Sequence, residues 1–154
     1  MSFELNLDSE TVDQVSTSIP LIAGPGFVLR DVLRMMKDQR KGAVLVCEND
    51  LLVGIFTERD ALKLLAAGAN LDVPVREVMT ANPESLSDQD TVATAILKMS
   101  RGGYRRMPVV DGEGRPKGFV KVATILHYLV EHFPSVVYTL PPQPHYTTET
   151  REGA

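Results

Sequence analysis

The sequence contains no tryptophan and only one cysteine, Cys47, in 154 residues. A single cysteine excludes an intrachain disulfide and provides no cysteine spacing typical of a metal site. Cys47 ends an apolar run, which predicts a buried thiol rather than a reactive one. No apolar run approaches the length of a membrane span, and the N-terminus lacks a basic stretch followed by an apolar one. We therefore expect a soluble, cytoplasmic protein.

Basic residues are outnumbered by acidic ones. The chain has 16 Lys and Arg against 20 Asp and Glu, which gives a formal net charge of −4. A mildly acidic chain is a poor candidate for binding nucleic acid or an anionic membrane surface, so we expect neither partner. Any anion site must come from a local cluster of basic residues. The hydrophobic fraction of 44% is high enough for a packed core.

Motifs of catalysis are also absent from the sequence. No phosphate-binding P-loop, nucleophile elbow or dinucleotide glycine motif occurs. His127 and His132 are five residues apart, off the i,i+4 face that helical metal ligands share, and His145 lies near the C-terminus. The carboxylates are not grouped in any evident pattern. We expect no catalytic residue, no metal and no required cofactor, and predict that the protein is not an enzyme.

The strongest positive signal is an internal repeat. Gly54 matches Gly118, Val28 matches Val92 and Val46 matches Val110, all at an offset of 64 residues. Leu33, Met35, Leu62 and Leu65 match Leu97, Met99, Leu126 and Leu129 at the same offset, so no gap is expected between the copies. Two like modules predict a shared buried face and a pseudo-twofold axis. Such an axis creates equivalent clefts between the modules, where ligands commonly bind.

Each copy has the pattern strand–helix–strand–strand–helix, which predicts an α+β fold with a small sheet in each unit. Neither unit is large enough to be stable alone. The sequence divides into an N-terminal segment 1–15, a first repeat 16–72, a second repeat 73–133 and a Pro-rich C-terminal tail 134–154. Within the N-terminal segment, Phe3, Leu5 and Leu7 alternate as in a short strand.

Three short motifs resemble those of the tandem CBS domain family, also called the Bateman module. The segment 54–60, Gly-Ile-Phe-Thr-Glu-Arg-Asp, resembles the family's strand-to-helix motif. The segment 105–111, Arg-Arg-Met-Pro-Val-Val-Asp, resembles its basic-apolar-Pro-Val-Val-Asp strand, and Val78-Met79-Thr80 with Pro83 resembles the entry to a second repeat. The resemblance covers about residues 16–133. It implies a flat module of two repeats that binds AMP, ADP, ATP or S-adenosylmethionine in its clefts and pairs into a homodimer.

Thr57 and Asp60 lie at a strand-to-helix junction in the first copy. The N–H groups of a helix start attract anions, and a carboxylate can accept two hydrogen bonds from neighbouring ribose hydroxyls. The resemblance assigns that ribose role to Asp60. The alternative is a capping box, in which Thr57 caps the helix and Asp60 reaches back to it. We expect the ribose role.

Arg105 and Arg106 precede an apolar strand. The planar guanidinium forms paired, charged hydrogen bonds with phosphate, and the resemblance assigns phosphate contacts to these two positions. Because neighbours on a strand point to opposite faces, we expect only one of them to reach a given cleft. Lys41, as the counterpart of Arg105, is a further candidate, although a surface lysine explains it better; Arg59 is expected to be solvated or at a dimer surface.

The adenine base would need apolar walls. Four residues of the first copy are candidates, each explained at least as well as part of the core: Ile19, Ile22, Val44 and Ile55. Phe56 and Phe119 are expected in the core. The second copy departs from the family pattern, because Lys121 stands where the Thr is expected and Thr124 where the Asp is expected. A second cleft built on these residues is therefore doubtful.

The sequence thus predicts a regulatory module that senses an adenosine-containing nucleotide and transmits its occupancy to a dimer or partner surface. No effector domain is evident, so an unidentified protein partner is one possible target. The alternative is a structural dimerisation module whose clefts are vestigial. The altered second copy favours that alternative, whereas the intact Thr57–Asp60 motif opposes it.

Overall fold

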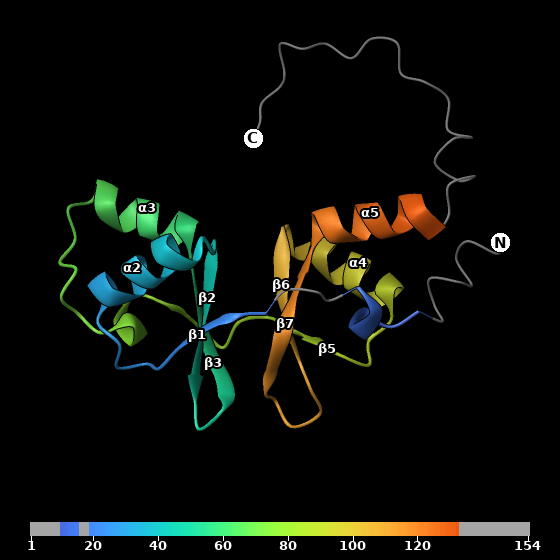
Figure 1. Ribbon diagram of the computed structural model, residues 1–154, viewed down its shortest axis with the longest axis horizontal. Coiled ribbons are helices and arrows are strands. Elements are labelled where there is room, and N and C mark those ends of the chain that lie inside the picture. The colour runs from blue at the N-terminus through green and yellow to red at the C-terminus, as the bar shows by residue number, and fades with distance from the viewer. Residues whose placement is uncertain (1–9, 16–18, 133–154) are drawn as a thin grey trace, which may run out of the picture.

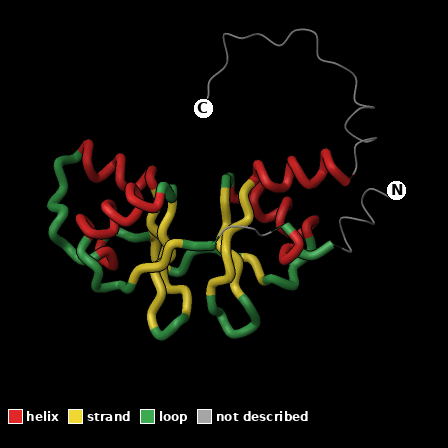
Figure 2. Tube along the Cα trace, viewed as in Figure 1, coloured by secondary structure: helices red, strands yellow, loops and turns green. Residues whose placement is uncertain are grey.

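The computed structural model describes residues 10–15 and 19–132 of the chain. Two units of similar build stand side by side, with their strands at the centre of the molecule and their helices on the outside (Figures 1 and 2). This is the predicted α+β arrangement of two tandem repeats. The strand suggested for residues 3–7 and the tail 134–154 lie outside the described residues.

The first repeat places two helices on a four-stranded sheet of order β1-β2-β3-β4, in which β4 (Thr80–Ala81) follows both helices in the chain. Strand β1 is parallel to β2, and the other neighbours are antiparallel. Its consecutive elements are β1 (Leu21–Ala23), α2 (Leu29–Gln39), β2 (Ala43–Glu48), β3 (Leu51–Thr57) and α3 (Glu58–Ala66). The hairpin between β2 and β3 turns on Asn49 and Asp50, which both have positive φ, as a two-residue type I′ turn requires.

The second repeat repeats this plan on a three-stranded sheet of order β5-β6-β7. Its elements are β5 (Leu86–Ser87), α4 (Val92–Gly102), β6 (Arg106–Val110), β7 (Pro116–Lys121) and α5 (Val122–His132). Thr91 caps α4 by accepting a hydrogen bond from the Thr94 N–H at 3.1 Å, so the helix starts at Val92. None of the described helices has the length and apolar character needed to cross a membrane.

Two short 3-10 helices each pack into the core of a repeat to which they do not belong in sequence, which was not predicted. The helix η1 (Val12–Gln14) precedes the first repeat, yet Val12 and Val15 are buried in the core of the second. The helix η2 (Val75–Glu77) lies at the start of the second repeat, yet Val75 is buried in the core of the first. Strand β4 (Thr80–Ala81) likewise pairs with β3 of the first repeat. Each core is therefore completed by a segment from beyond its own repeat.

The sequence predicted that the two repeats align without a gap, but the structure shows a shift of one residue between them. Before the hairpin, equivalent positions are 63 residues apart: Leu29 corresponds to Val92, Val32 to Ala95 and Met36 to Met99, and all six are buried. After the hairpin the offset is 64, because the turn after β6 is longer than the one after β2. Val28, the predicted match of Val92, is instead an exposed N-cap residue. The shift was not evident from the sequence, because Met35 and Met36 are adjacent and either can be matched with Met99.

A third apolar cluster joins the repeats. Ala43, Leu45 and Phe119 are buried there, and Cys47, Leu52 and Ile55 pack against them. The core positions predicted for Phe56 and Phe119 are confirmed, with exposed fractions of 0% and 5%. The hairpins of the two repeats also meet, where the Leu52 N–H donates to the Gly114 carbonyl at 3.2 Å. This shared cluster fixes the relative position of the residues that line the cleft described next.

Candidate functional site

A cleft of about 690 Å³ opens between the repeats, within the size range of small-molecule sites. The first repeat contributes the end of β3 and the start of α3, and the second contributes the segments before and within β6. The residues that line it are Gly42, Ile55, Thr57, Glu58, Arg59, Asp60, Thr80, Pro83, Glu84, Gly103, Tyr104, Arg105, Arg106 and Pro108. Five of the nine residues predicted for the ligand site are therefore brought together in it.

Thr57 and Asp60 form a capping box at the start of α3. The Asp60 N–H donates to Thr57 Oγ1 at 3.3 Å, while Asp60 Oδ2 accepts from the Thr57 N–H at 3.0 Å and from the Thr57 hydroxyl at 3.1 Å. The alternative reading of this pair is thus present in the structure. It does not exclude ligand binding, because all three contacts use Oδ2 or the Asp60 N–H, and Oδ1 accepts no hydrogen bond from the described residues.

The N–H groups of α3 contribute less to an anion site than the sequence suggested. The Glu58 N–H donates to the Gly42 carbonyl at 3.0 Å, and the Asp60 N–H is taken by Thr57. Two of the first three N–H groups of the helix are therefore already satisfied. Side-chain cations must supply most of the attraction for a phosphate.

Both Arg105 and Arg106 line the cleft, which corrects the expectation that only one would reach it. The expectation applied strand alternation to both residues, but β6 begins at Arg106 and Arg105 lies in the preceding loop. The backbone of Arg105 is fixed by its carbonyl, which accepts from the Val122 N–H at 2.9 Å. Arg59 also lines the cleft, although the sequence analysis placed it outside.

Two carboxylates of the cleft, those of Glu58 and Glu84, were not among the residues predicted for the site. Together with Asp60 they equal in number the guanidinium groups of Arg59, Arg105 and Arg106. The signal that could have found Glu58 is its position, since it directly follows Thr57 within the quoted motif. The cleft is consequently polar and charged without a net excess of either sign.

Four of the predicted ligand-site residues lie outside the residues that line this cleft. Ile19 and Ile22 are 81% and 45% exposed, Lys41 is exposed, and Val44 is fully buried in the core of the first repeat. The reason is the symmetry of the module, because the cleft combines one repeat's strand-to-helix junction with segments of the other repeat. Pro83 and Pro108 of the second repeat therefore line the cleft together with Ile55, where residues of the first repeat were expected.

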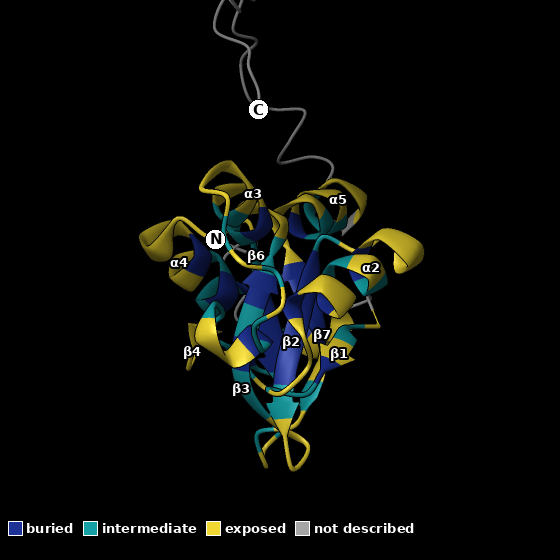
Figure 3. Cartoon of the chain, turned by 90° about the vertical axis from the view of Figure 1, so that its left-hand side faces the viewer, coloured by how far each residue is buried: buried dark blue, intermediate teal, exposed yellow. Residues whose placement is uncertain are grey.

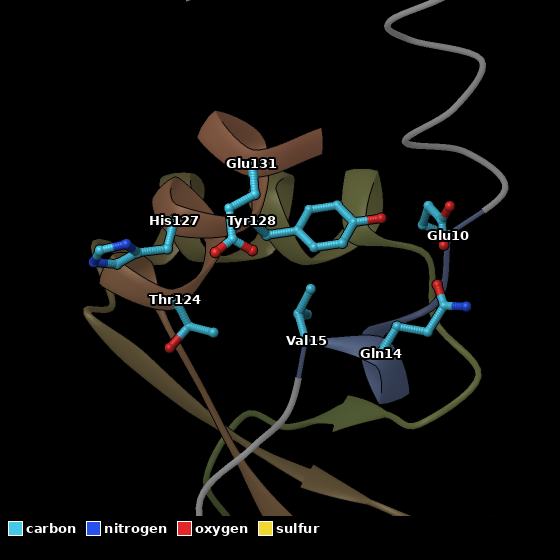
Figure 4. Close-up of a pocket in the computed structure, with 7 residues that line it drawn as sticks. All are labelled: Glu10, Gln14, Val15, Thr124, His127, Tyr128 and Glu131. Atoms are coloured by element: carbon cyan, nitrogen blue, oxygen red, sulfur yellow. The ribbon is translucent and has the colours of Figure 1, made fainter. Parts of the chain in front are cut away.

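The second copy does not bring its two candidates to a common cavity. Thr124 lines a different cavity of about 480 Å³ between α5 and η1, and Lys121 is exposed at the end of β7. In that cavity, the Tyr128 ring points toward Glu10, and the Thr124 side chain lies below α5 (Figure 4). Burial and the nearby Glu10 carboxylate, which accepts a hydrogen bond from Tyr128, raise the pKa of the Tyr128 hydroxyl.

Metal ligands are not clustered in the part of the chain that the structure describes, where no group of three or more His, Cys, Asp or Glu could hold an ion. Cys47 is half-buried beside the cluster between the repeats. Its burial, with a smaller contribution from Asp50, raises the pKa of the thiol above its usual value. A thiol in this state is a weak nucleophile.

The family model for the CBS domain matches residues 12–67 and again residues 75–131. The chain belongs to the CBS domain family. An uncharacterised 17.7 kDa protein of Acidianus ambivalens is 26% identical over 121 residues, which cover 78% of this chain and 73% of that protein. The arabinose 5-phosphate isomerase KdsD of Francisella tularensis is 31% identical over 124 residues, which cover 80% of this chain but only 38% of the isomerase.

Solved structures of CBS domain proteins share the fold. The CBS domain protein PAE2072 of Pyrobaculum aerophilum, complexed with AMP, superposes with a TM-score of 0.70 at 23% identity and covers 79% of this chain and 98% of its own. The CBS domain pair of protein MJ0100, in complex with 5-methylthioadenosine and S-adenosylmethionine, has a TM-score of 0.70 at 23% identity, over 79% of this chain and 96% of that one. The two matches of the family model and this shared fold make the chain a tandem CBS pair, as the resemblance of its motifs implied.

Proposed function

We propose that the protein is a regulatory module that binds an adenosine-containing nucleotide in the cleft between its CBS domains. The observation that carries this proposal is the meeting of Thr57 and Asp60 with Arg105 and Arg106 in one cleft. Asp60 Oδ1 would accept a ribose hydroxyl, and the two guanidinium groups would bind phosphate. Ile55 would lie against the adenine. Bound AMP in PAE2072 and bound S-adenosylmethionine in the MJ0100 pair support this class of ligand.

Tyr104 is the residue through which we expect occupancy to be transmitted. It lines the cleft and also lines an apolar groove of about 370 Å³ between α4 and α5. Its ring lies against Gly102, where even a methyl group would collide with it. A ligand that repositions this ring would change the groove wall beside Val122 and Leu126. Such a ligand would strengthen or weaken the binding of a second chain to the groove.

An exposed apolar surface on α3 and α5 supports the proposal of a homodimer. Helices α3 and α5 lie along the same edge of the molecule and turn exposed faces outward (Figures 1 and 3). Leu62 and Leu65 on α3 are 69% and 54% exposed, and Leu126 and Val130 on α5 are 56% and 45% exposed. Leu62 and Leu126 occupy equivalent positions in the repeats, so the surface is suited to pairing with a second copy of itself.

The test is thermal unfolding of the purified protein with AMP, ADP, ATP and S-adenosylmethionine, each in large excess. A ligand that binds only the folded state at 100 times its dissociation constant should raise the melting temperature by about 5–10 °C. Asp60→Ala should abolish the rise, whereas the matched control Thr124→Ala, at the equivalent position of the second repeat, should keep it. Light scattering of the same samples reports the oligomeric state.

The competing function is a structural dimerisation module with vestigial clefts. The altered residues Lys121 and Thr124 favour it, since they remove the capping motif from the second repeat. A stable dimer that shows no melting shift with any of the four ligands would support this alternative. Turnover of a nucleotide during the incubation would instead require an enzymatic function.

A further inference from the structure

A carboxylate and a guanidinium converge on one backbone position of the cleft. A Cβ atom added to Gly42 would stand 2.6 Å from Glu58 Oε1 and 3.0 and 3.1 Å from the two terminal nitrogens of Arg106. The two side chains come from different repeats, and the absence of a side chain at Gly42 gives them room. A phosphate that binds Arg106 therefore lies close to the negative charge of Glu58.

The balance of charge in the cleft has a consequence for the ligand. Arg59, Arg105 and Arg106 attract phosphate, but each further phosphate of a ligand also meets the carboxylates of Glu58 and Glu84. A monophosphate adds a charge of about −1.5 to −2, which the guanidinium groups of Arg105 and Arg106 can match, whereas a triphosphate adds more negative charge than the arginines of the cleft can neutralise. Like charges repel one another, and because Glu58 and Glu84 are exposed, the repulsion is reduced by water and salt.

Glu58 is particular to this cleft. The equivalent residue at the start of α5 is Val122, so the second repeat places no carboxylate at this position. The Glu58 backbone is also fixed, because its N–H donates to the Gly42 carbonyl at 3.0 Å. The side chain therefore starts from a defined point beside Arg106.

We propose that Glu58 is a specificity residue that restricts the cleft to adenosine compounds with at most one phosphate. This inference rests on the proposed nucleotide-binding function and adds the ligand class to it. Glu58 repels the outer phosphates of ADP and ATP, while Arg105 and Arg106 retain the first phosphate. AMP, and adenosine compounds without a phosphate, are accepted.

The experiment is calorimetric titration of the full chain with AMP and with ATP, in the presence of EDTA so that metal ions do not neutralise the phosphates. It compares the unaltered protein with Glu58→Gln and with Glu48→Gln. Glu48 is an exposed glutamate at the end of β2, away from the cleft, so its replacement makes the same change in net charge. We expect AMP to bind more tightly than ATP, and Glu58→Gln to improve ATP relative to AMP about fivefold.

The outcomes separate this inference from the function on which it rests. A shift in the ATP-to-AMP ratio with Glu58→Gln but not with Glu48→Gln supports Glu58 as the specificity residue. If the unaltered protein binds adenylates but prefers ATP, or if the ratio is unchanged by Glu58→Gln, the inference is wrong and the proposed function stands. If neither nucleotide binds the unaltered protein or Glu58→Gln, adenylate binding itself is wrong.

Discussion

The starts of helices α3 and α5 occupy equivalent places in the two repeats but differ in chemistry. Helix α3 begins with a complete capping box of Thr57 and Asp60, whose carboxylate faces the cleft. Helix α5 follows Lys121, whose ammonium group has no acceptor for a backbone N–H, and Thr124 lines another cavity. One fold plan thus carries a polar, charged site in one repeat and a different surface in the other.

The comparison shows that the fold and the site depend on different residues. The buried positions that form the two cores remain apolar in both repeats, as Leu29 and Val92 or Met36 and Met99 illustrate. The residues that face the cleft are free to change because their replacement leaves those cores intact. The predictions below test this separation, beginning with the core.

The largest effect is expected from shortening the buried phenylalanines. Phe56 is fully buried within the first repeat, and Phe119 is 5% exposed in the cluster between the repeats. Each change to alanine should lower the free energy of unfolding by about 3–5 kcal/mol, because it leaves a cavity. Urea unfolding followed by circular dichroism measures this, since the chain has no tryptophan.

The two phenylalanine variants differ in what else they disturb. Phe119 packs near Ile55, which lines the cleft, so Phe119→Ala should also weaken nucleotide binding at temperatures where the protein is still folded. A Phe119→Ala protein with unchanged stability would show that the repeats do not depend on their shared cluster.

The next effect separates capping from binding at Asp60. Asp60→Glu keeps the capping box, because glutamate is a preferred residue at this helix position, but it moves the carboxylate by one methylene. We expect AMP affinity to fall at least tenfold, while the melting temperature without ligand changes by no more than about 2 °C. Titration calorimetry and thermal unfolding provide the two readouts, and Thr124→Ala is the control.

An Asp60→Glu protein that binds AMP with full affinity would leave the carboxylate with a capping role alone. A large loss of stability in the absence of ligand would mean that the capping geometry itself requires aspartate. Either result would weaken the distinction drawn between the two helix starts.

Much of the fold could be predicted because the repeat and the apolar patterns are local properties of the sequence. The strands, the helices and the N-cap at Thr57 follow from them. The one-residue shift between the copies was missed because helical periodicity tolerates a neighbouring apolar residue, as at Met35 and Met36. The exchange of η1 and η2 was missed because short segments with one or two valines carry no periodic signal.

The site was predicted in part for a similar reason. Thr57 and Asp60 lie three residues apart on one junction, so their proximity is determined by the local chain. Their neighbours Pro83, Tyr104 and Pro108 come from the other repeat, and their arrival depends on how the two sheets pack. Ile19 and Ile22 were predicted to line the cleft because they belong to the same repeat as Thr57, but the cleft is built from both repeats.

A smaller effect is expected when the capping motif is transferred to the second repeat. The double variant Lys121→Thr with Thr124→Asp would give α5 the residues that start α3. We expect the free energy of unfolding to rise by about 1 kcal/mol, because the new side chains satisfy helix N–H groups and place a negative charge at the helix start. Urea unfolding of the double variant beside Lys121→Ala with Thr124→Ala measures the gain, which the alanine pair should lack.

The smallest effect concerns Cys47, whose equivalent in the second repeat is the apolar residue Val110. Because burial, followed by Asp50, raises the pKa of the thiol, less thiolate is present at pH 8 than for an ordinary cysteine. Alkylation by iodoacetamide, followed by mass spectrometry, should therefore be several-fold slower than that of free cysteine and should speed up as the pH rises. The chain has a single cysteine, so the mass shift has one source.

Saturating AMP should leave the alkylation rate nearly unchanged, because Cys47 lies at the cluster between the repeats and is not among the residues that line the cleft. Strong protection of Cys47 by AMP would show that ligand binding tightens the contact between the repeats.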